Sequence, residues 1–349
     1  MASDFSQKQM PMTRYQGSKR RIVNWIIGAV KELDFESALD IMGGTGTVAY
    51  NLKKLGKNVT YNDFLLWNYH NGVALIENKS TLIDSSDIEK IFTVDDAYEY
   101  DDLVERIFPD IYFTNEENIE IDIVAQNIAM LADGIKKSMA YFCLCQTLIM
   151  KRPYNLFHRK NLYMRTDDVE RSFGNKATWE KPIRNAFEQV AKELNASTFD
   201  NGMVTQSKNL DCFDVKSGYD LVYIDSPYLN GKGTGVDYRG FYHFLDGICD
   251  YKNWEEKIDL KSKHRRLVPE NNPWNDSKKM SGNFHRLFSK HSESIIVVSY
   301  RTDGIPSVSE IKRQLERTKK EVRVYYREGL QYALSPNKKN AEVLLIGTG

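Results

Sequence analysis

The chain has 349 residues, a length that suits one α/β domain carrying an insertion. Hydrophobic residues make up 41% and charged residues 28% of it, no apolar run approaches a membrane span, and the N-terminus lacks the apolar segment of a secretion signal. The net charge is zero, which argues against a simple nucleic-acid coat. We therefore expect a cytoplasmic globular protein without a membrane-spanning segment.

Charge is distributed unevenly along the chain. Residues 81–122 contain fourteen Asp and Glu against two Lys and Arg, whereas residues 251–290 contain ten Lys and Arg against five Asp and Glu. The first stretch would repel phosphate and the second would attract it. Either could also be an ordinary solvated helix face.

The four cysteines, at 143, 145, 212 and 249, form no C-x-x-C pair, and the six histidines are scattered. Because neither residue type shows the spacing of metal ligands, we expect free thiols and no metal site.

The first regular elements predict a βαβ unit. A strand is expected over 38–42, a tight turn over Gly43–Gly46, the start of a helix over 47–54, and a second strand over 58–61 that ends on Asn62 and Asp63. Downstream, apolar residues at helical spacing predict a packed helical pair over 122–150. Further strands are expected over 221–224, 294–300, 322–326 and 342–346, separated by helical or irregular stretches such as 181–194 and 307–319. This alternation predicts an α/β fold with a mostly parallel, doubly wound sheet.

The glycine turn permits three interpretations. Gly44-Thr-Gly46-Thr-Val-Ala49 satisfies the dinucleotide pattern G-x-G-x-x-A, with Asp63 placed to hold a ribose, so it fits NAD, another nucleoside ligand or a purely structural turn. Asp40 precedes the glycines, and a pyrophosphate would gain nothing from a carboxylate there. A cofactor that carries an ammonium and a sulfonium would be attracted to it.

The segment Asp225-Ser226-Pro227-Tyr228 ends another expected strand, at the sheet edge where ligands of open α/β sheets bind. Asp225 and the carbonyl oxygen of Ser226 could accept both hydrogens of a substrate NH₂ group and favour its pyramidal, reactive form. Pro227 would fix the turn, and Tyr228 could stack on a base swung out of its helix. A polar turn without function is the alternative.

These motifs together resemble the AdoMet-dependent DNA adenine-N6 methyltransferases of the Dam-like family. Tyr15-Gln-Gly17-Ser-Lys19, the turn from Asp40 to Gly46, and Asp225 to Tyr228 keep the family's order and approximate spacing. The stretch YNLFHRKN, which starts at Tyr154, is similar to the family's YNGLxRxN, and the segments VVSYRTDGIP and YALSPNKKNAEVLLI are similar to its closing strands. The resemblance is spread over most of the chain.

The resemblance implies a Rossmann-like methyltransferase fold with inserted recognition segments and S-adenosyl-L-methionine (AdoMet) as methyl donor. Lys19 would pair with the carboxylate of AdoMet, Asp63 would accept from its ribose hydroxyls, and Asp211 would read its adenine amino group. The other residues implied for the methionine part are Tyr15, Gly17, Asp40, Gly43, Gly44 and Gly46. Ser226 departs from the family, which usually has proline there, but serine keeps the carbonyl acceptor.

The leading hypothesis is therefore a site-specific methyltransferase that transfers a methyl group to N6 of a flipped adenine in double-stranded DNA. One alternative is an enzyme of the same fold acting on cytosine N4, RNA or a protein amide, and another is a non-catalytic scaffold that binds AdoMet, nucleotides or nucleic acid. A cognate restriction endonuclease as partner is an expectation from the family alone.

We expect five segments. Residues 1–75 would form the AdoMet part of the catalytic domain, 76–150 a partly acidic helical insertion, 151–230 the catalytic motif with a DNA-contact loop, 231–290 a basic insertion rich in aromatics, and 291–349 the closing strands. Because the acidic stretch would repel phosphate, DNA contacts are expected elsewhere. The basic candidates are Lys151, Arg152, Arg159, Arg165 and Arg171, and the aromatic candidates are Tyr238, Phe241, Tyr242, Trp254, Trp274 and Phe284.

Overall fold

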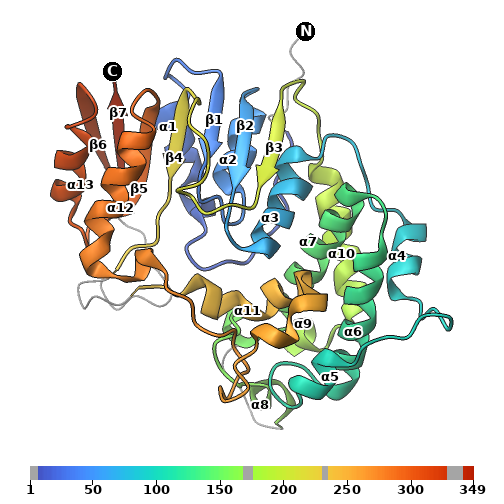
Figure 1. Cartoon of the computed structure of the whole chain (residues 1–349). Coiled ribbons are helices and arrows are strands. Elements are labelled where there is room, and N and C mark those ends of the chain that lie inside the picture. The colour runs from blue at the N-terminus through green and yellow to red at the C-terminus, as the bar shows by residue number, and fades with distance from the viewer. Residues whose placement is uncertain (1–6, 168–175, 230–234, 328–340) are drawn as a thin grey trace. The chain divides into compact units, whose positions relative to one another are not determined.

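The computed structural model describes residues 7–167, 176–229, 235–327 and 341–349 (Figure 1). The chain divides into two compact units, each assembled from three separate stretches. Unit 1 comprises residues 1–18, 65–200 and 238–269, and unit 2 comprises residues 19–64, 201–237 and 270–349. Each unit is described below by itself.

Unit 2 is built on a seven-stranded sheet in the order β3-β2-β1-β4-β5-β7-β6. The strands are β1 (Ser37–Asp40), β2 (Asn58–Asn62), β3 (Thr205–Lys208), β4 (Leu221–Ile224), β5 (Ile295–Arg301), β6 (Glu321–Arg327) and β7 (Glu342–Thr348). Strands β1 to β5 pair in parallel, and β7 runs antiparallel to both of its neighbours, β5 and β6. Strands β1 and β4 are completely buried at three and four positions respectively, as expected for strands covered on both faces.

Helices cover both faces of this sheet. Helices α12 (Ser277–Lys290) and α13 (Val308–Leu315), orange in Figure 1, pack on one face, where alternate residues such as Leu39, Val222 and Val298 form one core with them. Helices α1 (Val23–Val30) and α2 (Thr47–Lys54) pack against each other, and α2 contacts β1 and β2. Two 3₁₀ turns, η1 (Lys19–Arg21) and η6 (Pro273–Asn275), complete the described helical elements of this unit.

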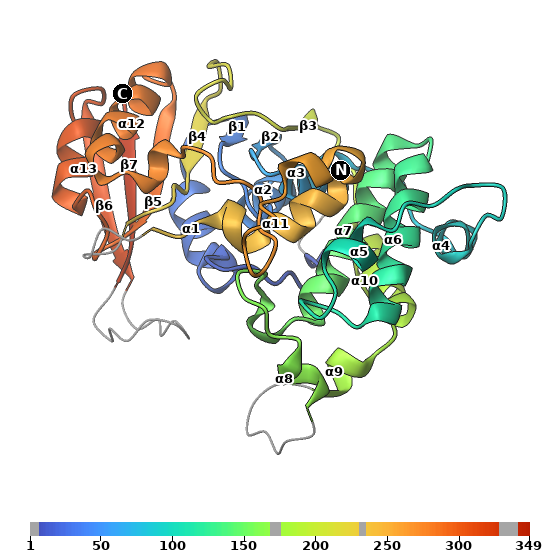
Figure 2. The same ribbon diagram turned by 60° about the horizontal axis from the view of Figure 1, so that its bottom comes forward.

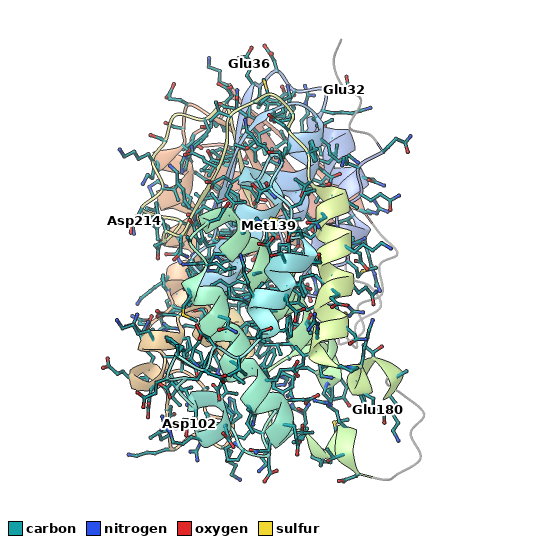
Figure 3. All side chains as sticks on the ribbon, turned by 90° about the vertical axis from the view of Figure 1, so that its right-hand side faces the viewer. Glu32, Glu36, Asp102, Met139, Glu180 and Asp214 are labelled. Atoms are coloured by element: carbon teal, nitrogen blue, oxygen red, sulfur yellow. The ribbon has the colours of Figure 1, made fainter. Side chains whose placement is uncertain are left out.

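Unit 1 is helical. Its longer helices are α6 (Asn115–Met130), α7 (Gly134–Met150), α10 (Ile183–Ser197) and α11 (Tyr238–Cys249). The shorter ones are α3 (Leu66–Gly72), the π-helical turn η2 (Val73–Glu77), α4 (Ser85–Phe92), α5 (Leu103–Ile107), η3 (Pro153–Asn155), α8 (Tyr163–Thr166), α9 (Lys176–Glu180), η4 (Tyr251–Asn253) and η5 (Glu255–Lys257). Helix α7 is central, because it packs against α3, α6 and α10 and is buried from Ser138 to Ile149 (Figure 2). In Figure 3 its Met139 lies among the helices, whereas the exposed Asp102 and Glu180 point outward.

The expected fold class is confirmed. The sheet is doubly wound and mostly parallel, strand 221–224 has the expected bounds, and 122–150 forms the expected helical pair as α6 and α7. Strand β3 was not predicted, because Thr205–Lys208 is polar and only its first residue is buried. The glycine loop 231–235 lies mostly outside the described residues, and YALSPNKKN lies wholly outside them. No described helix is long and apolar enough to cross a membrane.

Candidate functional site

Two carboxylates lie at the carboxyl ends of the neighbouring parallel strands β1 and β4. Asp40 is the last residue of β1 and pairs in register with Tyr223, two residues before Asp225. The strand order reverses between β1 and β4, since β2 and β3 follow on one side and β5 on the other. Open α/β sheets bind ligands at this kind of switch point, so the sheet brings Asp40 and Asp225 to the position where a ligand is expected.

Asp225 forms an ion pair with Lys19. The Lys19 Nζ atom lies 3.0 Å from Asp225 Oδ1 and 3.9 Å from a carboxylate oxygen of Glu342, the first residue of β7. Burial raises the pKa of Asp225 to about 6, although the neighbouring Lys19 charge opposes this shift. For Lys19 burial acts to lower the pKa, but the charges of Asp225 and Glu342 outweigh it and hold the pKa well above its usual value. The predicted pairing of Lys19 with a cofactor carboxylate stays a prediction.

Asp40 presents a buried carboxylate oxygen that no described residue contacts by a hydrogen bond. Its side chain is 1% exposed, and Oδ2 accepts a hydrogen bond of 3.2 Å from the backbone N–H of Ala49 in the first turn of α2. Oδ1 is buried without a hydrogen-bond partner among the described residues. Burial first, and then the negative charges of Asp225 and Asp63, raise the pKa of Asp40 well above its usual range. A cationic ligand would satisfy this oxygen and relieve the repulsion between the carboxylates.

The glycine turn between β1 and α2 depends on its glycines for local reasons. Gly44 and Gly46 have φ values of 52° and 74°, the left-handed region that favours glycine, and Gly46 caps α2. A Cβ atom on Gly43 would lie 2.1 Å from Cε2 of Tyr61, whose hydroxyl donates a 2.6 Å hydrogen bond to the carbonyl of Gly44. Packing alone therefore accounts for these glycines, and their contact with a cofactor stays a prediction.

Asp63, directly after β2, accepts a 2.9 Å hydrogen bond from the backbone N–H of Gly44 and so connects the ends of β1 and β2. Asp211 is exposed, and its Oδ1 accepts a 2.8 Å hydrogen bond from the N–H of Phe213, which stabilises a local turn. Sequence reasoning missed Asn62. Its amide donates to the carbonyls of Ile41 and Leu210, both at 3.0 Å, and thereby fastens the Asp211 segment to the strand ends. Its position at a strand end was the available signal.

The Asp-Ser-Pro-Tyr segment is held at its far end as well. Ser226 is 2% exposed, and its Oγ has no hydrogen-bond partner within the described part of the chain. The hydroxyl of Tyr228 accepts a 2.8 Å hydrogen bond from Nη1 of Arg301, and its ring meets that of Tyr300 edge-on. Arg301, the last residue of β5, was also missed, because nothing in its local sequence distinguishes it from a solvated cation.

Tyr15 and Gly17 belong to unit 1. The ring of Tyr15 stacks on those of Tyr238 and Tyr242, with centroid distances of 5.4 and 4.9 Å. Gly17 has a φ of 86°, and a Cβ atom there would lie 2.7 Å from the Tyr238 hydroxyl oxygen. The first part of the Tyr-x-Gly-x-Lys segment thus packs on helix α11. Its contact with AdoMet stays a prediction.

Several predicted DNA contacts were wrong. Trp254, Trp274, Tyr242 and Phe284 are at most 6% exposed, so their rings belong to hydrophobic cores and present no surface to a base. Tyr242 and Phe284 were misassigned because aromatic residues on the buried faces of α11 and α12 alternate in sequence with charged residues on the exposed faces. Trp254 and Trp274 lie in or beside short 3₁₀ turns, where no helical period separates buried from exposed positions. Tyr238 and Phe241 are partly exposed.

Three of the predicted basic contacts are also structural. Lys151 and Arg165 form ion pairs with Glu117 at 2.9 and 2.7 Å. Arg152 is 1% exposed and donates hydrogen bonds to the carbonyls of Tyr112, Leu156 and Arg159. They were misassigned because a sequence does not distinguish a buried cation from an exposed one. Arg159 and its neighbour Lys160 are exposed and remain available, whereas Arg171 lies outside the described residues.

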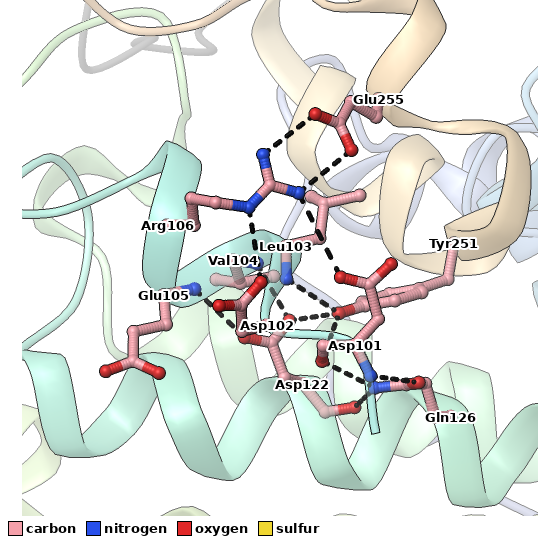
Figure 4. A network of polar contacts seen from close by, with 10 residues as sticks. All are labelled: Asp101, Asp102, Leu103, Val104, Glu105, Arg106, Asp122, Gln126, Tyr251 and Glu255. Atoms are coloured by element: carbon pink, nitrogen blue, oxygen red, sulfur yellow. Dashed lines mark hydrogen bonds and ion pairs between the residues drawn. The ribbon is translucent and has the colours of Figure 1, made fainter. Parts of the chain in front are cut away.

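The acidic stretch 81–122 uses several carboxylates to stabilise helix starts. Asp122 of α6 accepts hydrogen bonds from the N–H groups of Val104 and Glu105 at the start of α5, and the hydroxyl of Tyr251 donates to it (Figure 4). Arg106 forms two hydrogen bonds with Glu255, of 2.8 and 2.9 Å. This stretch therefore packs against η4 and η5 as part of unit 1. No group of three or more candidate ligands among the described residues is placed to hold a metal ion.

Comparison with known proteins identifies a family that matches most of the chain. A family model described as D12 class N6 adenine-specific DNA methyltransferase matches residues 15–303. The chain is also 26% identical over 322 residues to the Type II methyltransferase M2.HphI of Haemophilus parahaemolyticus, in an alignment that covers 90% of each protein. The family match begins at Tyr15 and includes the glycine turn and the Asp-Ser-Pro-Tyr segment.

Proposed function

Because the chain belongs to the family of D12 class N6 adenine-specific DNA methyltransferases, we propose that the carboxyl edge of its sheet at β1 and β4 is the catalytic centre. The observation that carries this proposal is that a buried Asp40 oxygen without a hydrogen-bond partner in the described ranges and the Lys19–Asp225 ion pair lie at one switch point. The first can hold a cationic ligand, and the second holds an acceptor for a substrate amine.

The proposed cofactor is S-adenosyl-L-methionine, which supplies a methyl group activated by the positive charge on its sulfur. Asp40 Oδ1 would accept a hydrogen bond from its ammonium group, and Asp63 would accept from its ribose. Asp40 suits this role because its surroundings are negatively charged even before a ligand arrives. Further contacts are proposed from Tyr15, Gly17, Gly43, Gly44, Gly46 and Asp211.

The proposed substrate is an adenine flipped out of double-stranded DNA. Asp225 and the carbonyl of Ser226 would accept the two N6 hydrogens and draw the nitrogen toward its pyramidal form, which frees its lone pair. Pro227 restricts the turn, and the ring of Tyr228 would stack on the base. Asp225, whose pKa burial raises to about 6, could also take the proton that a methylated amino group must lose.

The direct test is to incubate the purified protein with AdoMet labelled in its methyl group and a mixture of plasmid DNAs, and to identify the labelled nucleoside after digestion. N6-methyl-2′-deoxyadenosine as the labelled product would support the proposal, and the Asp225→Ala variant is the matched negative control. Labelled N4-methylcytosine would contradict the proposed base, and label in RNA or protein only would contradict the proposed substrate.

A restriction endonuclease with the same recognition sequence is the proposed biological partner, as the Type II name of the similar Haemophilus protein suggests. Plasmid isolated from cells that express this chain should then resist an endonuclease that cleaves at the methylated sequence. Plasmid from cells expressing Asp225→Ala should stay sensitive. If the wild-type plasmid is methylated but no such endonuclease is blocked, the partner proposal fails while the methyltransferase proposal stands.

A further inference from the structure

Arg301 reaches the stacking tyrosine from a neighbouring strand. It is the last residue of β5, which pairs in parallel with β4, and the Asp-Ser-Pro-Tyr segment follows β4 directly. Its Nη1 atom lies 2.8 Å from the Tyr228 hydroxyl oxygen, and its guanidinium carbon lies 5.0 Å from the centroid of the Tyr228 ring. One side chain thus contacts both the hydroxyl and the aromatic ring of Tyr228.

The guanidinium itself is fixed. Its Nη2 atom forms an ion pair of 2.9 Å with Asp303, two residues further along, and Arg301 is only 8% exposed. A planar guanidinium held through one nitrogen leaves its other donors in a defined direction, which a lysine ammonium would not do. Arg301 therefore presents a pre-oriented donor to Tyr228.

The backbone couples the same two loops. The N–H of Ile305 donates a 2.9 Å hydrogen bond to the carbonyl of Leu229, and these residues form an isolated antiparallel bridge. The segment 225–229 is consequently held at three points, by Lys19 at Asp225, by Arg301 at Tyr228 and by Ile305 at Leu229.

We propose that Arg301 is a positioning residue for the methyl transfer reaction, which fixes the ring of Tyr228 in the orientation that stacks on the target adenine. This inference rests on the proposed function of the Asp-Ser-Pro-Tyr segment. Arg301 acts through the Tyr228 hydroxyl and needs no contact with the substrate. Without it the phenol ring could turn about its side-chain bonds, and the stacked arrangement would form less often.

The test is a double-variant cycle on kcat and KM for a duplex that carries the methylation site. Arg301→Met should lower kcat by about tenfold to a hundredfold, the range expected for loss of a hydrogen bond from a charged donor, with little change in KM. Tyr228→Phe keeps the ring, loses the hydroxyl and should cause a similar loss. In the Tyr228→Phe background, Arg301→Met should then change kcat less than about threefold. Arg301→Lys should recover only part of the rate.

Arg323→Met is the matched control, because Arg323 lies on β6 with 61% of its side chain exposed and forms an ion pair with its neighbour Glu321 on the same strand. Its kcat should equal that of the wild type. The proposal is overturned if Arg301→Met keeps kcat within about twofold of the wild type, or if the two losses multiply in the double variant. If Arg301→Met fails to fold, the kcat values of Arg301→Lys and Tyr228→Phe are compared with that of the wild type instead.

A second readout needs no turnover. With 3-fluorotyrosine placed at position 228, the fluorine resonance should be single and narrow in the wild type and broadened or split in Arg301→Met. An unchanged resonance overturns the positioning role even if the chain methylates none of the DNA tested. Conversely, a wild type that shows the narrow resonance but produces no N6-methyladenine contradicts the proposed function and leaves the Arg301–Tyr228 contact established.

Discussion

Lys19 Nζ lies 3.0 Å from Asp225 Oδ1, so the lysine of the Tyr-x-Gly-x-Lys segment contacts the first residue of the Asp-Ser-Pro-Tyr segment. Two motifs that are about 200 residues apart in the sequence therefore form one charged unit, in which the cation favours the ionised carboxylate.

Removing this cation should shift the pH dependence of the enzyme. In Lys19→Met no lysine charge opposes the effect of burial on Asp225, so the pKa of Asp225 should rise further. The acid limb of the kcat/KM profile should therefore move to higher pH by about one unit or more. Arg21→Met is the control, since Arg21 is an exposed neighbour in the same 3₁₀ turn. An acid limb at the same pH in both variants would contradict the ion pair's role.

Activity of the wild type should fall as the pH drops through about 6, because only the ionised Asp225 accepts from the amino group. The contribution of this carboxyl to the free energy of unfolding changes with pH in the opposite direction to activity. Its pKa is raised above the usual 3.8, so the stabilisation is complete below about pH 4 and is lost as the pH rises through about 6. Rate measurements from pH 5 to 8 test the first statement. Asp225→Asn should lower kcat by about a hundredfold or more and abolish the limb.

Asp40→Asn should separate cofactor binding from folding. The amide can still accept from the Ala49 N–H, and it removes a buried negative charge beside Asp63 and Asp225, so the melting temperature without ligand should be equal or higher. The Kd for AdoMet, measured by calorimetry, should rise about tenfold or more because the charged hydrogen bond is lost. An unchanged Kd would exclude Asp40 from the cofactor site.

Ser226→Ala should have kcat within about twofold of the wild type. The Ser226 hydroxyl has no partner among the described residues, whereas the proposed acceptor is the backbone carbonyl, which alanine retains. Single-turnover rates on the same duplex provide the comparison. A large loss would show that the hydroxyl itself takes part.

Arg152 and Arg159 should behave differently although seven residues separate them. Arg152→Met removes a buried cation that donates hydrogen bonds to the carbonyls of the 156–159 segment. We expect the free energy of unfolding to fall by about 3 kcal/mol or more. Arg159→Ala changes an exposed side chain and should leave the melting temperature unchanged. If Arg159 contacts a DNA phosphate, its removal should weaken binding and lower the salt dependence of log Kd by about one. Equal DNA binding at every salt concentration would exclude that contact.

The sequence was most informative where a local pattern determines the structure. Helix α2 begins at the predicted Thr47 and strand β4 has its predicted bounds because turn residues flank these segments, and Asp40 and Asp225 lie at strand ends for the same reason. The pattern was uninformative where long-range packing decides. Trp254 and Arg152 are residue types that are common on nucleic-acid-binding surfaces, but here both are buried. Trp254 packs against Phe108 and Arg152 against Tyr112, and both partners are distant in the sequence. Arg301 could not be predicted as a partner of Tyr228, because the pairing of β4 with β5 brings the two residues together.

The order of the strands has a consequence for synthesis of the chain. Strands β1 and β2 pair with each other, and their outer neighbours are β4 and β3: Ala38 of β1 pairs with Leu221 of β4, and Val59 of β2 pairs with Thr205 of β3. Both outer neighbours are translated only after the whole segment 65–200. During that interval β1 and β2 expose two unpaired edges, while the helices of segment 65–200 can already form from local contacts. Because unpaired edges of this kind can pair with other chains, we expect chaperone binding to the nascent protein to be strongest in this interval.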